Sequence, residues 1–190
     1  MTATVEAEKK LTVREFREMD FPENDPFIYE LINGELVRKQ APSPKHQETV
    51  AELIFLLKTY LKANPNGRIF PAPTDVFLDE NNNIQPDISF VSEARDFLVD
   101  DKNGILGTPD LIMEIISPGN VRRDRVTKME LYERFAVREY WLIDPNNRTV
   151  EIYVMRENRY AEHQFLEAEG KAISTVMTGF ELEIKDLFGS

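Results

Sequence analysis

Glu114 stands inside a run that is otherwise apolar, residues 111–116. The run is short, rich in isoleucine and bounded by Pro109 and Pro118, which is typical of a central strand buried on both faces. A carboxylate there is costly unless a cation, a metal ion or a set of hydrogen bonds offsets its desolvation. We therefore expect Glu114 to have such a partner.

Asp87 and Lys128 are the residues that could share a site with Glu114. Asp87 lies on the polar side of residues 84–91, whose alternation predicts a strand. Lys128 lies on the apolar stripe of a predicted helix. Two carboxylates on adjacent strands, with a lysine beside them, can form a site for Mg²⁺ or Mn²⁺, and the main-chain carbonyl of Ile115 could add a ligand. A metal-held water beside a lysine is a route to phosphodiester hydrolysis.

Residues 108–144 contain Glu114 and Lys128 and must hold them in place. Their pattern predicts a strand, a helix and a second strand. The helix spans about residues 122–136, and the second buried strand covers residues 139–144. A right-handed crossover between parallel strands follows from this order. Asp124 lies four residues before Lys128 and could help to hold it. The apolar stripe of the helix comprises Val121, Leu131, Tyr132 and Phe135.

Residues 29–38 predict a β-hairpin. Its turn is Asn33-Gly34, the preferred pair for a two-residue turn in which both positions need positive φ. The turn sets the register, so that Glu30 and Glu35 share one face with Ile32 and Val37. These two carboxylates could face solvent, or they could overhang an active site.

Residues 43–63 predict a long helix that begins with Ser43 as its cap and proline at the first helical position. His46 falls on the apolar stripe of this helix, four residues before Val50. Such a histidine is either a structural residue with its hydrogen bonds satisfied or a functional ligand, and the pattern leaves both readings open.

The remaining pattern completes an α/β fold in one domain. A mixed sheet is expected from residues 68–78, 84–91, 109–117 and 139–144, flanked by the two helices. A capping box at residues 12–15 predicts a short first helix. Residues 149–166 predict a second hairpin, and residues 172–188 predict one more strand and an apolar anchor at Leu187 and Phe188. The first ten residues are polar and are expected to be frayed.

The composition excludes several classes of protein. The chain has 190 residues, a net charge of −11, no cysteine and two histidines. Disulfides, thiolate zinc sites, cysteine nucleophiles and three-histidine sites are therefore excluded. The negative charge argues against broad affinity for nucleic acids but allows a local basic cleft or binding through metal ions. No apolar run is long enough to span a bilayer and the start lacks a signal-peptide pattern, so we expect a cytoplasmic protein without membrane association.

These residues, in this order, resemble the PD-(D/E)xK restriction-endonuclease-like superfamily, and more closely the Uma-two family of putative restriction endonucleases. The resemblance covers about residues 12–188. The ordered set of motifs is specific, although each motif alone is weak. The matching segments are residues 29–35 (YELINGE), 43–46 (SPKH), 85–88 (QPDI), 110–118 (DLIMEIISP) and 139–145 (EYWLIDP), with Asp124, Lys128 and Tyr132 between the last two.

The resemblance implies a restriction-endonuclease-like mixed sheet, with an N-terminal hairpin and extra C-terminal strands, and a Mg²⁺- or Mn²⁺-dependent DNA endonuclease. Asp87 and Glu114 take the places of the two metal-binding acids. The usual lysine position two residues after the second acid holds Ile116, so Lys128 is the candidate for that role. Glu30, Glu35 and His46 also match motif positions of the family, as does Asp124. DNA is the implied partner, and a homodimer is left open.

Each residue also has a structural reading. Glu114 and Lys128 could form a buried ion pair that only sets the packing, and Asp87 could merely cap a turn. The departure at Ile116 and the acidic charge favour a second function, a catalytically silent relative that binds nucleic acid or a protein. A metal-dependent hydrolase of smaller phosphoesters is a third. Metal binding that depends on Asp87 and Glu114 separates the silent relative from the enzymes.

Overall fold

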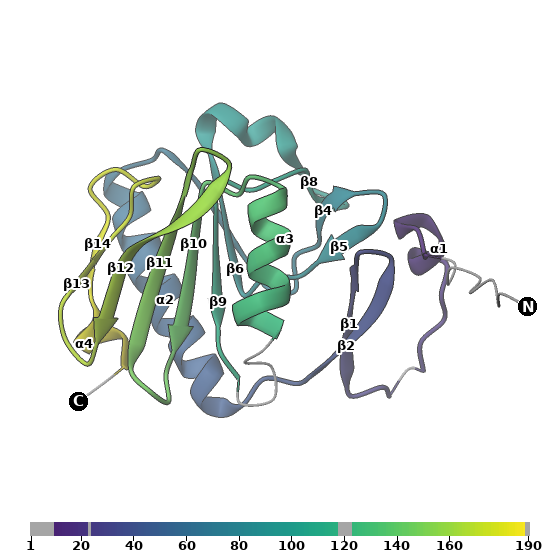
Figure 1. Ribbon diagram of the computed structural model, residues 1–190, viewed down its shortest axis with the longest axis horizontal. Coiled ribbons are helices and arrows are strands. Elements are labelled where there is room, and N and C mark those ends of the chain that lie inside the picture. The colour runs from purple at the N-terminus through teal and green to yellow at the C-terminus, as the bar shows by residue number, and fades with distance from the viewer. Residues whose placement is uncertain (1–9, 23, 118–122, 189–190) are drawn as a thin grey trace, which may run out of the picture.

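The fold is built on a six-stranded mixed sheet (Figure 1). The computed structural model describes residues 10–22, 24–117 and 123–188. In this sheet only β9 and β10 are parallel, and every other neighbouring pair is antiparallel. The expected crossover between parallel strands is thus confirmed. The strands, in spatial order, are β12 (Arg159–Glu167), β11 (Thr149–Arg156), β10 (Glu139–Asp144), β9 (Leu111–Ile115), β6 (Ile88–Ser92) and β3 (Gly67–Pro71).

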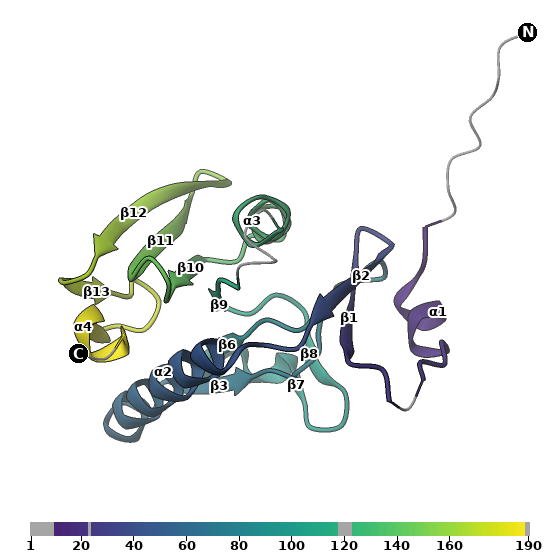
Figure 2. The same ribbon diagram turned by 90° about the horizontal axis from the view of Figure 1, so that it is seen from below.

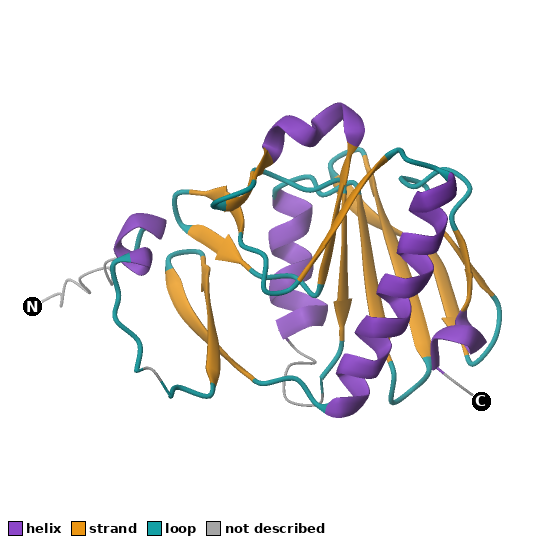
Figure 3. Cartoon of the chain, turned by 180° about the vertical axis from the view of Figure 1, so that it is seen from behind, coloured by secondary structure: helices purple, strands orange, loops and turns teal. Residues whose placement is uncertain are grey.

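Two helices cover opposite faces of this sheet, as Figures 2 and 3 show. Helix α2 (Pro44–Ala63) lies on one face. A π-helical segment, η2 (Arg123–Lys128), continues into α3 (Met129–Arg134) on the other. The helix predicted over residues 122–136 is therefore present where the structure describes it, while Val121 and Arg122 lie outside the described residues.

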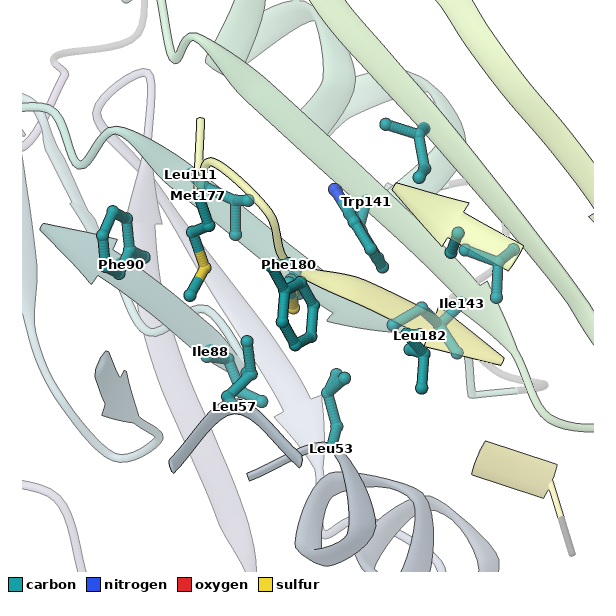
Figure 4. Close-up of a cluster of buried hydrophobic side chains, with 14 of the residues drawn as sticks. Leu53, Leu57, Ile88, Phe90, Leu111, Trp141, Ile143, Met177, Phe180 and Leu182 are labelled. Carbon is teal, nitrogen blue, oxygen red and sulfur yellow. The ribbon is translucent and has the colours of Figure 1, made fainter. Parts of the chain in front are cut away.

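Both faces of β9 are buried, as its apolar sequence requires. Met113 and Ile115 belong to a core cluster with Leu53 and Leu57 of α2. Figure 4 shows part of this cluster, where Leu57 of α2 lies close to Ile88 on β6. On the other face, the joining core contains residues of β9, α3 and the second sheet. We use this name for the buried cluster Ile32, Val76, Ile84, Val91, Ile105, Ile112, Ile116, Leu131, Tyr132, Val137, Tyr140 and Leu142.

The predicted N-terminal hairpin forms the edge of a second, smaller sheet. Its strands are β1 (Phe27–Ile32) and β2 (Glu35–Gln40), and the register sets Ile32 opposite Glu35, as expected. Asn33 and Gly34 have φ of +57° and +77°, the positive values that this turn requires. The other strands, in spatial order after β1, are β5 (Asn82–Ile84), β4 (Val76–Asp79), β8 (Gly104–Leu106) and β7 (Val99–Asp100).

Two of the predicted strands divide between the two sheets. Residues 68–78 supply β3 to the large sheet and β4 to the small one, and residues 84–91 supply the end of β5 and most of β6. Prolines 71, 73 and 86 lie at these breaks, and a residue without an N–H group cannot continue a ladder. The segment Gln85–Asp87 therefore carries the chain from the small sheet to the large one.

The remaining elements lie at the two ends of the chain and in the connection after β6. The capping box is confirmed, and α1 (Val13–Arg17) follows it. A 3₁₀ helix (Glu93–Leu98) follows β6. The C-terminal segment forms two paired strands instead of the single one expected, β13 (Lys171–Ile173) and β14 (Glu181–Glu183), and then α4 (Ile184–Phe188). No described helix is long and apolar enough to cross a bilayer. The expectation for the N-terminus concerns residues 1–9, which lie outside the described part.

Candidate active site

Asp87 and Glu114 meet where β6 and β9 lie side by side. Strand β6 runs antiparallel to β9 with Ile88 opposite Met113, so continuing the register by one residue sets Asp87 opposite Glu114. Both side chains are almost fully buried, with 9% of Asp87 and 2% of Glu114 exposed. The adjacent-strand placement expected of the two carboxylates is thus observed.

Glu114 faces the helix that follows it in the chain. Lys128 Nζ lies 2.5 Å from Glu114 Oε1, and the Tyr132 hydroxyl donates to the same oxygen at 2.6 Å. Lys128 has no exposed surface, and its Nζ also lies 3.5 Å from Glu30 Oε1. The expected ion pair of Glu114 is therefore present and fully enclosed.

Asp87 is held by the start of α2 and by the backbone of β9. His46 Nε2 lies 3.1 Å from Asp87 Oδ2, and the Ile115 N–H donates to that same oxygen at 2.7 Å. The Ser43 hydroxyl accepts from the His46 N–H, which fixes the first turn of α2 and hence the position of the imidazole. His46 thus contacts Asp87, and its Nδ1 is buried with no hydrogen-bond partner among the described residues.

Glu30 brings the hairpin to the site. Its Oε1 accepts from the Gln85 N–H at 2.9 Å and lies 3.2 Å from Lys39 Nζ, and the side chain is fully buried. Lys39 was not among the predicted site residues. The hairpin register contained the signal, because Glu35, Val37 and Lys39 alternate onto the face that carries Glu30.

Asp124 reaches the site, whereas Glu35 does not. Asp124 is 4% exposed, and its main-chain carbonyl accepts from the Tyr140 hydroxyl at 3.0 Å. Within the described residues, no ion pair joins Asp124 and Lys128, although the charge of Lys128 acts to lower the pKa of Asp124. Glu35 is exposed at the start of β2 and does not line the pocket described next.

A pocket of about 200 Å³ opens onto these groups. The two predicted metal-binding acids, Asp124, Ile115, His46 and Lys39 all line it. Glu30 and Lys128 lie behind this lining, the former beneath Lys39 and the latter beneath Glu114. The pocket wall therefore presents three carboxylates and one lysine.

The surroundings raise the pKa of two carboxyl groups of the site and lower the pKa of the other two. Burial raises the pKa of Glu114 to about 7; the charge of Lys128 opposes this change and that of Asp87 adds to it. Burial also raises the pKa of Asp124, again against the charge of Lys128. For Asp87, burial acts in the same direction, but the hydrogen bond and charge of His46 outweigh it and the pKa is lowered. For Glu30, Lys128 and Lys39 together outweigh burial, so its pKa is lowered as well.

The ionised site carries excess negative charge. Glu30, Asp87, Glu114 and Asp124 supply four negative charges, against two positive charges from Lys39 and Lys128 and a third from His46 when its imidazole is protonated. A divalent cation would offset the negative excess, and carboxylate oxygens are the ligands that Mg²⁺ prefers. No group of three or more His, Asp or Glu side chains is arranged to hold a metal ion anywhere in the described ranges. A cation here would therefore rely on two carboxylates, a carbonyl and water.

Whether a cation fits here depends on the carboxylate oxygens of Asp87 and Glu114 that accept no hydrogen bond. Hydrogen bonds from the described residues end on Oδ2 of Asp87 and Oε1 of Glu114, which leaves Oδ1 and Oε2 for another ligand. The N–H and C=O groups of one strand residue point the same way, so the Ile115 carbonyl points with its N–H toward Asp87. The donor set suits a hard cation that keeps several waters.

Comparisons with known proteins agree with this architecture. A family model, Uma2, described as "Putative restriction endonuclease", matches residues 13–185. A crystal structure of a protein described as a putative nuclease belonging to DUF820, from Anabaena variabilis, superposes with a TM-score of 0.75. It is 24% identical over 94% of this chain and 97% of that one, so the likeness concerns the fold. No curated protein matches the sequence significantly.

Proposed function

Because the chain belongs to the Uma2 (Uma-two) family of putative restriction endonucleases, we propose that it is a metal-dependent endonuclease that hydrolyses phosphodiester bonds of DNA. One observation carries the proposal: Asp87 and Glu114 meet across β6 and β9 at the wall of a single pocket, each with one oxygen free of hydrogen bonds from the described residues. This is the arrangement that a two-carboxylate Mg²⁺ or Mn²⁺ site needs.

Asp87, Glu114 and the carbonyl of Ile115 would hold the cation. When bound, a divalent cation supplies an acidified water and neutralises charge that develops at phosphorus. His46 and the Ile115 N–H orient Asp87, and Tyr132 orients Glu114. Asp124 adds a third carboxylate that can order water at the pocket wall.

Lys128 takes the place of the superfamily's lysine in this proposal. Its ammonium touches Glu114 and Glu30 and is fully buried, so it acts on the reaction through Glu114. Its charge opposes the effect of burial on the pKa of Glu114, which favours the ionised form that a cation requires.

A nuclease assay tests the proposal. Plasmid and linear DNA are incubated with Mg²⁺ or Mn²⁺ and the wild type, Asp87→Ala or Asp101→Ala, the last being a control because its side chain is 89% exposed. We expect cleavage by the wild type and the control, and none by Asp87→Ala. The proposal fails if the wild type leaves DNA intact with both metals, or if Asp87→Ala cleaves at the wild-type rate.

A catalytically silent module that binds nucleic acid or protein is the second candidate. The observation that favours it is Ile116, which occupies the usual lysine position and is buried in the joining core, only 2% exposed. This candidate predicts DNA binding without cleavage. Titration with Mn²⁺ separates the two, because a silent module has no need of a cation held by Asp87 and Glu114.

A further inference from the structure

Lys39 is the one lysine or arginine, among the described residues, that lines the candidate pocket. It projects from β2 of the hairpin, and 13% of its side chain is exposed. Lys128, by contrast, has no exposed surface and is enclosed by Glu114 and Glu30. A ligand that enters the pocket therefore meets the ammonium of Lys39 and not that of Lys128.

The contacts of Lys39 leave part of its hydrogen-bonding capacity free. Its Nζ lies 3.2 Å from Glu30 Oε1 and donates to the Gln85 carbonyl at 3.3 Å. An ammonium group has three donors, and no third hydrogen bond from Nζ is made within the part of the chain that the structure describes. The third donor is available to a ligand in the pocket.

A phosphodiester needs such a donor at this place. The pocket wall carries three carboxylates, and the whole chain has a net charge of −11, so an anionic substrate is repelled by most of its surroundings. A divalent cation would offset the carboxylates, but a phosphate has further oxygens to satisfy. Lys39 is placed to supply a positive charge and a hydrogen bond to one of them.

Resting on the proposed function, we propose that Lys39 is a catalytic residue, whose ammonium contacts the scissile phosphate while Lys128 positions Glu114 from behind. The four groups form a chain that starts at Lys39 in the pocket wall, passes behind the wall through Glu30 and Lys128, and returns to the wall at Glu114. The N–O separations are 3.2 Å from Lys39 to Glu30, 3.5 Å from Glu30 to Lys128 and 2.5 Å from Lys128 to Glu114. Glu30 thereby fixes both lysines, one toward the pocket and one toward the carboxylate.

The electrostatic effects of Lys39 agree with this placement. Its positive charge acts to lower the pKa of Glu30, Asp87, Glu114 and Asp124. Arg38, its neighbour on β2, is exposed and lies over the ring of Phe27 at 4.1 Å, so it makes a matched control outside the pocket.

The rival explanation is that Lys39 only neutralises Glu30. Two pairs of variants separate the two roles. Lys39→Met and Lys39→Arg are compared with the wild type, and Arg38→Met is the control. Lys39→Met alone leaves the buried Glu30 carboxylate without Lys39 and could fail to fold. The double variant Glu30→Gln/Lys39→Met is therefore compared with Glu30→Gln, because residue 30 carries no charge in either of them.

Binding of a fluorescein-labelled DNA duplex is measured by anisotropy in Ca²⁺ at several salt concentrations, and cleavage is measured in Mg²⁺. Loss of one charge-assisted hydrogen bond should weaken binding by roughly 10- to 100-fold. The slope of log K against log salt should fall by about one. The value of kcat/KM should fall by about 10²- to 10³-fold, and Lys39→Arg should retain most of it. Arg38→Met should keep the wild-type cleavage rate.

The outcomes separate this inference from the proposed function. If the wild type cleaves and Lys39→Met keeps its salt slope and cleavage rate, the inference is overturned and the function stands. Equal binding by Glu30→Gln and the double variant also overturns the inference, because the lysine then serves Glu30 alone. If the wild type neither binds nor cleaves the duplex, the proposed function fails and the role of Lys39 fails with it.

Discussion

Replacement of Lys128 by methionine tests the electrostatic description of the site directly. The substitution keeps most of the volume and removes the ammonium, which has no exposed surface and lies 2.5 Å from Glu114. Breaking a buried ion pair by removing one partner costs about 3–5 kcal/mol, since the other charge is left uncompensated. Lys128→Met should therefore lower the free energy of unfolding by up to roughly this amount at a pH where the remaining carboxyl groups are ionised.

The loss should depend on pH in a defined direction. Lys128 opposes the effect of burial on Glu114, so without it the pKa of Glu114 rises above about 7. A carboxyl group whose folded-state pKa is raised does not destabilise the fold below its unfolded value, and its cost appears as pH rises toward the folded value. The wild type carries the same cost of Glu114 up to about pH 7, so the deficit of Lys128→Met that comes from Glu114 should be small near pH 5 and should grow above pH 7, by at most about 1.4 kcal/mol per pH unit.

Urea unfolding of the wild type and Lys128→Met at pH 5, 6, 7 and 8 measures this difference. Lys58→Met is the control, because Lys58 is exposed on α2 and should change stability by less than about 0.5 kcal/mol. Lys128→Met/Glu114→Gln should regain part of the loss, since neither charge is then left alone. A deficit below about 1 kcal/mol at pH 8, or one that shrinks with rising pH, would refute the reasoning.

Three other predictions concern the metal, the pH dependence of the wild type and the hairpin. Calorimetric titration with Mn²⁺ should show binding to the wild type and none to Asp87→Ala/Glu114→Ala; equal binding by both would remove the metal site from these residues. Burial raises the pKa of Glu114 to about 7, so ionisation of this group lowers the free energy of unfolding of the wild type as pH rises from about 4.5 to 7. Glu114→Gln lacks this ionisation, so in urea titrations it should gain stability relative to the wild type over that interval. Gly34→Ala should lower the free energy of unfolding by about 1–3 kcal/mol, because φ is +77° and a Cβ would lie 2.6 Å from Lys10 Cβ; an unchanged urea midpoint would contradict this.

Local patterns predicted much of the fold because the signals were strong where the chain is regular. The Asn33-Gly34 turn fixed the hairpin register, the Ser43 cap fixed the start of α2, and the doubly apolar run around Glu114 predicted a central strand. The division into two sheets could not be predicted in this way. Pairing between distant strands depends on the whole packing, and the prolines indicated breaks without indicating which sheet each piece joins.

The site was predicted in outline for a similar reason. A carboxylate in an apolar strand and a lysine on an apolar helical stripe are unusual enough to indicate their pairing, and the structure brings Glu114 and Lys128 together. Lys39 was missed because its neighbours Arg38 and Gln40 are also polar, so that nothing in composition distinguishes it. Only the register of the hairpin, combined with the position of Glu30, identifies its face. The contact of His46 with Asp87 joins residues 41 positions apart, and no local pattern specifies it.

The joining core has a consequence for how the molecule unfolds. Ile32, Val76, Ile84 and Ile105 of the small sheet are buried in the same cluster as Leu131 and Tyr132 of α3. Opening the hairpin alone would expose that shared core together with the charges of Glu30 and Lys128. Partial opening should therefore cost nearly as much as complete unfolding, and the two sheets should behave as one cooperative unit. Amide protons in β1 and β9 should then exchange with solvent at closely similar free energies.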